Sequence, residues 1–196
     1  MDSEYTSQSR MKIPELLHRS ETGAPFEHCM MCNRFLLDEG TPYMIEKAVR
    51  QIPEMNVTEI IFEYAMCMEC AERMNETLSV ESRTRIAEYF SANVNPMDRA
   101  AKLQSDSEPR IEKWIDHCAV KNTPISSSNE YQVVAQCNGR NMMLNFFPIA
   151  LSFEALDEMS QLLSAKSRGE IDDFIGKYFT GPPEVSEILK KKLVFI

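Results

Sequence analysis

The stretch VTEIIFEYAMCMEC, residues 57–70, joins a strand pattern directly to a pair of cysteines. Over residues 57–65, apolar or aromatic side chains alternate with Glu59 and Glu63, which is typical of a half-buried strand. Cys67-Met-Glu-Cys70 follows at once and opens a segment whose apolar residues recur at three- and four-residue steps. We therefore predict a strand that runs into a helix ending near residue 91, and we allow for a break in that helix near Ser79.

A second pair, Cys29-Met-Met-Cys32, precedes this stretch. Two such pairs supply the four thiolates that a soft metal ion binds in a tetrahedron. Asn33 suits a tight loop after the first pair, because asparagine tolerates left-handed backbone geometry. Cys67 and Cys70 lie three residues apart, so both sulfurs can face one ion from a first helical turn. We predict that Cys29, Cys32, Cys67 and Cys70 bind Zn²⁺ in a closed structural site that leaves no position for water.

The order of these segments resembles the treble-clef class of four-cysteine zinc modules. Residues 43–50, which the pattern alone leaves open between helix and strand, would pair with residues 57–65 across the loop QIPEMN. The resemblance covers about residues 27–91 and implies a cysteine knuckle, a β-hairpin and a helix; zinc ribbons are a related alternative. The class includes nucleases, nucleic-acid readers and protein-interaction modules, so the fold does not decide the function. Nuclease members need a histidine on or beside the hairpin, and residues 33–66 contain none.

Other ligands and metals remain as alternatives at this site. His28, next to Cys29, could replace one thiolate. An iron–sulfur cluster is disfavoured because the spacing lacks the compact ferredoxin pattern. Methionines flank both pairs and could favour monovalent copper, although methionine more often fills irregular gaps in a core.

The chain divides by pattern into two folded parts of an α+β protein. We predict a tail with a short helix (1–21), a zinc-binding domain (22–92), a polar linker (93–107) and an α+β domain (108–196). The last domain would contain a helix, a hairpin and three further helices. The expected signals are a helix around Ile111 to Cys118, a turn at Asn138-Gly139, a helix cap at Ser152, a capping box from Ser167 to Glu170, and a last helix starting near Pro183. No internal repeat is apparent beyond the two cysteine pairs.

Composition limits the possible partners. The formal net charge of -9 opposes binding to phosphate backbones, so nucleic acid is a disfavoured partner. The first twenty residues lack the apolar core of a signal peptide, and no run is long enough for a membrane helix. We therefore expect a cytoplasmic protein whose cysteines stay reduced, with Cys118 and Cys137 as buried thiols.

These observations favour a non-enzymatic, structural zinc protein that binds another protein, while the oligomeric state cannot be predicted. One alternative is a redox- or metal-responsive switch, since zinc-bound thiolates can be oxidised. A second is an enzyme with its site in residues 108–196, which a pocket lined by Trp114, His117 or paired carboxylates would favour. The acidic residues there fit solvated helix faces: Asp116, Glu154, Asp157, Glu158, Asp172 and Asp173.

Overall fold

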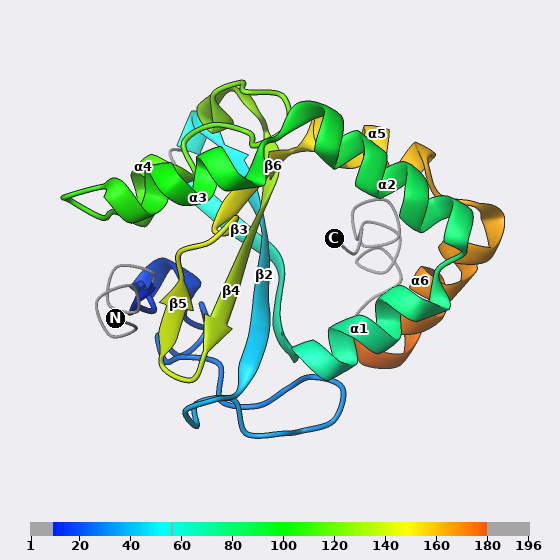
Figure 1. The fold of residues 1–196 in the computed structure, drawn as a ribbon, viewed down its shortest axis with the longest axis horizontal. Helices are drawn as coiled ribbons and strands as arrows, with labels where there is room; N and C mark the ends of the chain where they lie inside the picture. The colour runs from blue at the N-terminus through cyan, green and yellow to red at the C-terminus, as the bar shows by residue number, and fades with distance from the viewer. Residues whose placement is uncertain (1–9, 56, 180–196) are drawn as a thin grey trace.

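The computed structural model describes residues 10–55 and 57–179, which fold around one antiparallel sheet (Figure 1). The sheet has six strands in the order β1-β5-β4-β2-β3, with β6 also paired to β4. The strands are β1 (Arg10–Lys12), β2 (Pro42–Ile52), β3 (Val57–Cys67), β4 (Glu130–Asn138), β5 (Asn141–Met143) and β6 (Ile149–Ser152). The α-helices are α1 (Met68–Thr77), α2 (Val80–Asn93), α3 (Pro96–Ser105), α4 (Ile111–Trp114), α5 (Phe153–Gln161) and α6 (Ala165–Tyr178). The expected α+β character is confirmed.

Strands β2 and β3 form the long hairpin expected from the alternating pattern. Their register pairs Tyr43 with Cys67 at one end and Ile52 with Val57 at the turn, with an irregularity at Ala48/Val49. The segment left open between helix and strand is therefore a strand. This hairpin places Cys67 at the end of β3 and Cys70 in the first turn of α1.

The helix after the second cysteine pair is interrupted as expected. Helix α1 ends at Thr77, and α2 begins at Val80 with Ser79 as its N-cap, whose side chain accepts a hydrogen bond from the Ser82 amide. A serine at this position satisfies an amide that has no partner inside the helix, which is why a new helix starts here. In Figure 1, α1, α2, α5 and α6 together form an arc on one side of the sheet.

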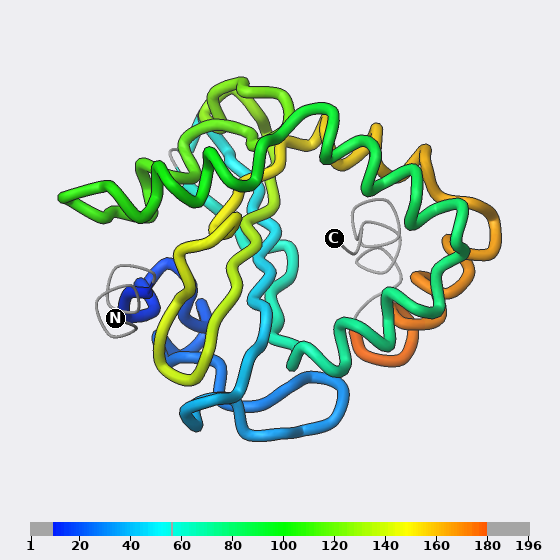
Figure 2. Tube along the Cα trace, viewed as in Figure 1, coloured from blue at the N-terminus to red at the C-terminus, as the bar shows by residue number. Residues whose placement is uncertain are grey.

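Strands from both expected domains form the one sheet. Strand β4 pairs with β2 from Pro42–Asn138 to Arg50–Glu130, so the described residues of the two expected domains, 22–92 and 108–196, share a sheet and a hydrophobic core. Figure 2 follows the chain from β3 through the helices and back into β4 beside β2. The stretch expected as a linker contains α3, which Asn95 caps through hydrogen bonds from the amides of Met97 and Asp98. This arrangement differs from two domains joined by a linker.

Several local predictions need correction. The helix expected around residues 111–118 stops at Trp114, because the chain then turns so that His117 pairs with Pro124 and Cys118 with Ala150. The turn expected at Asn138-Gly139 lies at Gly139-Arg140, because Asn138 still belongs to β4 and pairs with Asn141; Gly139 supplies the positive φ, of 56°. The short helix expected at residues 13–21 is a single 3₁₀ turn at Glu15–Leu17.

The last two described helices, α5 and α6, each begin at a serine N-cap. Ser152 caps α5 as expected and accepts a hydrogen bond from the Ala155 amide. Helix α6 starts three residues earlier than the expected capping box, because Ser164 is its N-cap and accepts from the Ser167 amide. The last helix, expected from Pro183, lies outside the described residues. None of the helices in the described part of the chain is long and apolar enough to cross a membrane.

Candidate metal centre

The four cysteines predicted as ligands come together at one point. The Sγ atoms of Cys29, Cys32, Cys67 and Cys70 all lie within 4.8 Å of one another. The Sγ atoms of Cys32 and Cys67 are 3.7 Å apart. Four thiolates at tetrahedral zinc, with Zn–S bonds of about 2.3 Å, place their sulfurs about 3.8 Å from each other. The site can therefore hold a metal ion with little rearrangement.

The first pair sits on a tight loop between two paired residues, His28 and Phe35. Inside the loop, the Cys29 amide donates to the Arg34 carbonyl at 2.9 Å, and the Asn33 amide donates to the Cys29 carbonyl at 2.9 Å. Asn33 has a φ of 60°, which confirms the left-handed geometry expected from its residue type. The loop thus turns both cysteines toward α1.

The second pair sits at the junction of strand and helix. Cys67 is the last residue of β3 and the N-cap of α1, and Cys70 lies in the first turn of that helix. The Cys67 amide donates to the Cys29 sulfur at 3.4 Å. Amides at a helix N-terminus have no partner within the helix and favour negative charge, which offsets part of the cost of burying a thiolate here.

The thiols differ in their electrostatic surroundings. Burial raises the pKa of Cys29, but hydrogen bonds from the Cys32, Cys67 and Met31 amides outweigh it and leave this pKa at about 7. Burial raises the pKa of Cys67 to about 12 and also raises the pKa of Cys70. A divalent ion supplies the positive charge that deprotonates thiols of this kind.

An ion pair joins the two halves of the site at its surface. The two terminal nitrogens of the Arg34 guanidinium donate to the two carboxylate oxygens of Glu69, at 2.6 and 2.7 Å. Arg34 follows the first cysteine pair, and Glu69 lies inside the second. Cys29, Cys67 and Cys70 are buried, whereas Cys32 is exposed. The site is therefore closed on its inner side and reachable by solvent at one sulfur.

The remaining sequence candidates lie elsewhere. His28 stacks edge-on against Phe35 and is not one of the clustered ligands. Cys118 and Cys137 are buried thiols, as expected, and none of the six cysteines, all of which the structure describes, forms a disulfide. Most of the acidic candidates are at least partly exposed, and Glu158 contacts Lys121 and Tyr89.

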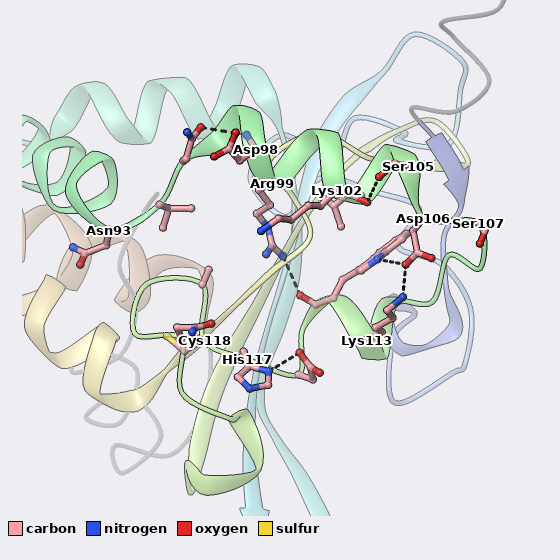
Figure 3. A pocket seen from close by; sticks show the side chains of 17 residues that line it. Asn93, Asp98, Arg99, Lys102, Ser105, Asp106, Ser107, Lys113, His117 and Cys118 are labelled. Atoms are coloured by element: carbon pink, nitrogen blue, oxygen red, sulfur yellow. Dashed lines mark hydrogen bonds and ion pairs between the residues drawn. The ribbon is translucent and has the colours of Figure 1, made fainter.

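A pocket of about 670 Å³ lies between α3, α4 and the loop after α4 (Figure 3). Figure 3 shows Arg99 and Lys102 reaching from α3 toward the loop that carries His117 and Cys118. His117 Nδ1 lies 2.8 Å from Asp116 Oδ1. The pocket includes the expected His117 and Trp114. Sequence reasoning missed Arg99 and Lys102, because they lie in a stretch that looked like a linker and carry no motif.

Comparison of the chain with family models, with curated proteins and with solved structures found no match.

Proposed function

We propose that this protein is a structural zinc protein of the treble-clef class, in which the ion joins the cysteine loop to helix α1. The supporting observation is the convergence of four sulfurs from two distant pairs, with the Cys32–Cys67 separation close to the tetrahedral value. Four protein ligands complete the coordination of zinc and leave no position for a reacting water. The ion then has a structural role.

The experiment that tests this proposal is metal analysis of the purified protein with a matched pair of variants. Wild type should carry one zinc ion per chain, and Cys67→Ser should lose it together with much of the cooperative unfolding transition. Cys137→Ser removes a buried thiol outside the cluster and should keep the ion. Cobalt in place of zinc should show the spectrum of tetrahedral thiolate coordination. A Cys67→Ser variant with unchanged metal content and melting curve would refute the ligand assignment.

We further propose that the protein acts in the cytoplasm by binding another protein. The net charge of -9 supports a protein partner over nucleic acid, because it opposes approach to phosphates. Affinity capture with the metal-loaded protein, followed by mass spectrometry, should return a partner that the chelator-treated protein does not. Capture of the same background proteins by both forms would count against this role.

The pocket beside α3 supports a second candidate function, the binding of a small anionic ligand. Its volume of about 670 Å³ lies in the usual range for ligand sites. Three cationic side chains line it together with three carboxylates: Arg99, Lys102, Lys113, Asp98, Asp106 and Asp116. Backbone carbonyls hold the Arg99 guanidinium and Asp106 holds Lys113, so Lys102 is the cation that would meet the negative group of a ligand. A panel of small carboxylates and phosphates should raise the melting temperature of wild type but not of Lys102→Ala. Lys166→Ala, an exposed position on α6, is the matched control. Equal shifts in all three proteins would remove this candidate.

A further inference from the structure

Two distant parts of this chain follow the same backbone path, contrary to the expectation of no repeat. Each starts with a His-Cys dipeptide, at residues 28–29 and 117–118. In each, the fourth residue after the cysteine is an asparagine with a left-handed backbone: φ is 60° at Asn33 and 52° at Asn122. Apart from glycines, these two are the positive-φ residues found in the described chain. Such a conformation is uncommon outside glycine, so the shared position marks a shared loop.

The hydrogen bonds of the two loops also correspond. The Cys29 amide donates to the Arg34 carbonyl at 2.9 Å, and the Cys118 amide donates to the Thr123 carbonyl at 2.8 Å. In both loops the asparagine amide donates back to the cysteine carbonyl, at 2.9 and 2.8 Å. Each loop is closed by one antiparallel bridge that starts at its histidine.

Each loop meets a strand that runs into a helix. The Cys67 amide, at the end of β3, donates to the Cys29 sulfur at 3.4 Å. The Ser152 amide, at the end of β6, donates to the Cys118 sulfur at 3.3 Å. Cys67 caps α1 and Ser152 caps α5, so Ser152 occupies in the second part the place that Cys67 occupies in the first.

The helix pairs that follow carry the same cap sequence and contact each other reciprocally. Leu-Ser-Val-Glu-Ser-Arg at 78–83 starts α2, and Leu-Ser-Ala-Lys-Ser-Arg at 163–168 starts α6. The Ser79 amide donates to Ser167 Oγ at 2.9 Å, and the Ser164 amide donates to Ser82 Oγ at 2.8 Å. A contact in which equivalent residues exchange roles is the signature of a two-fold axis.

Four strands of the sheet, β2, β3, β4 and β6, have the same symmetry, whereas β5, which also pairs with β4, and β1 have no counterpart in the first part. Strand β2 of the first part pairs antiparallel with β4 of the second, and the outer neighbours are β3 and β6, each of which ends at a helix cap. Antiparallel pairing of equivalent strands is what a two-fold axis between them requires. The two parts therefore associate like the subunits of a small symmetric dimer, within one chain.

We propose that residues 116–178 are a second copy of the metal module of residues 27–93, in which an ion pair has replaced the metal. This inference deepens the proposed function, because it takes the four-cysteine cluster as the original metal site. The positions equivalent to Cys29, Cys32, Cys67 and Cys70 are Cys118, Lys121, Ser152 and Ala155. One ligand of the four is retained, and the other three are changed.

The replacing interaction connects the same elements that the metal would connect. Lys121 Nζ, in the second loop, forms an ion pair with Glu158 Oε1 on α5. The Tyr89 hydroxyl donates to the other oxygen of Glu158 at 2.7 Å and adds a contact from α2. Glu158 lies three residues after Ala155, just as Arg73, which contacts the Cys70 sulfur at 2.8 Å, lies three residues after Cys70. The Lys121–Glu158 ion pair thus joins the second loop to α5, whereas in the first copy the cysteine sulfurs join the loop to α1.

The test is to restore the missing ligands in the full-length protein. The variant Lys121→Cys, Ser152→Cys, Ala155→Cys should bind one more zinc or cobalt ion per chain than wild type, measured by elemental analysis and by the cobalt–thiolate absorption. The matched control is Lys121→Cys, Phe153→Cys, Glu154→Cys, which shares the loop thiol and adds the other two at exposed positions in the first turn of α5. The control should bind no more metal than wild type.

The outcomes separate this inference from the proposed function. If wild type binds one ion and the folded triple variant also binds one, the inference is overturned while the proposed function stands. If wild type binds none and the triple variant binds one, the inference stands and the proposed function fails. If both bind none, both fail. An extra ion in the control as well would also overturn the inference, because position would then not matter.

A second variant covers the case in which the buried Ala155 position does not accept a larger side chain. Lys121→Cys, Ser152→Cys leaves Ala155 unchanged and offers three thiolates, including Cys118. It should bind one additional cobalt ion at saturating cobalt, more weakly than the triple variant. A double variant that folds in saturating cobalt without the additional ion overturns the proposal. One that fails to fold in saturating cobalt also overturns it, because the ion would then not take the place of the Lys121–Glu158 pair that the variant removes.

Discussion

Glu46 should make this protein less stable as pH rises toward neutrality. The residue lies in the middle of β2, is 3% exposed, and accepts a hydrogen bond at 2.6 Å from Gln132 on β4. Burial raises the pKa of Glu46 from 4.5 to about 7, despite the hydrogen bond from Gln132. The folded state therefore holds this proton more tightly than the unfolded state does. The stabilising effect is complete below pH 4.5 and is lost as pH rises through 7.

The size of the effect follows from the two pKa values. One pKa unit corresponds to about 1.4 kcal/mol, so the change from 4.5 to about 7 corresponds to about 3 kcal/mol. Most of this should appear between pH 5 and pH 8. A typical domain is stable by about 5–15 kcal/mol, so the change is easily measured.

The assay is urea unfolding of wild type and Glu46→Gln at several pH values across this range. Glutamine is neutral at every pH, so the stability of wild type relative to the variant should fall by about 3 kcal/mol from low to high pH. The comparison cancels the pH dependence of metal binding, which the two proteins share. Glu54→Gln, at an exposed position of the same hairpin, is the control. A pH-independent difference between wild type and Glu46→Gln would refute the reasoning.

Three further predictions concern the surface of the metal centre, a helix cap and thiol reactivity. In a double-mutant cycle, Arg34→Ala and Glu69→Ala should have nearly additive effects on the urea midpoint, because solvent screens this exposed ion pair; clearly non-additive effects would mean a structural role. Ser164→Ala should lower the free energy of urea unfolding by about 1 kcal/mol, since it removes the α6 cap, and an unchanged midpoint would contradict this. In metal-free protein, peroxide should oxidise the exposed Cys32 before the buried Cys118, and peptide mapping that finds equal oxidation would be inconsistent with this geometry.

The features that sequence reasoning predicted correctly are local ones. The β2–β3 hairpin follows from the alternation over residues 57–65, and the break before α2 follows from a serine cap at Ser79. The left-handed Asn33 follows from its residue type beside a cysteine pair. In each case the determining interaction lies within a few residues along the chain, where a pattern can report it.

The features that were missed depend on contacts between distant residues. Nothing in β2 alone indicates that its free edge pairs with β4, because register is set by which faces are buried together in the finished sheet. The apolar stripe after Ile111 fits a longer helix, but the chain leaves that helix after Trp114 to pair Cys118 with Ala150. Helix α3 looked like a linker because its sequence is polar, and Leu103 is its one residue in the buried core.

The repeat escaped sequence reasoning for a reason that follows from its energetics. A metal ion contributes strongly to folding, and its ligands form a conspicuous sequence motif. Once another interaction joins the loop to the helix, the ion is no longer needed and its ligands can be replaced. The Lys121–Glu158 pair is such an interaction. The loop asparagine and the helix-cap serines each contribute only about 1 kcal/mol and form a weak sequence signal, but the backbone path needs every one of them. In a duplicated metal module the metal ligands are therefore free to change, whereas the loop asparagine and the helix-cap serines are the residues that both copies keep.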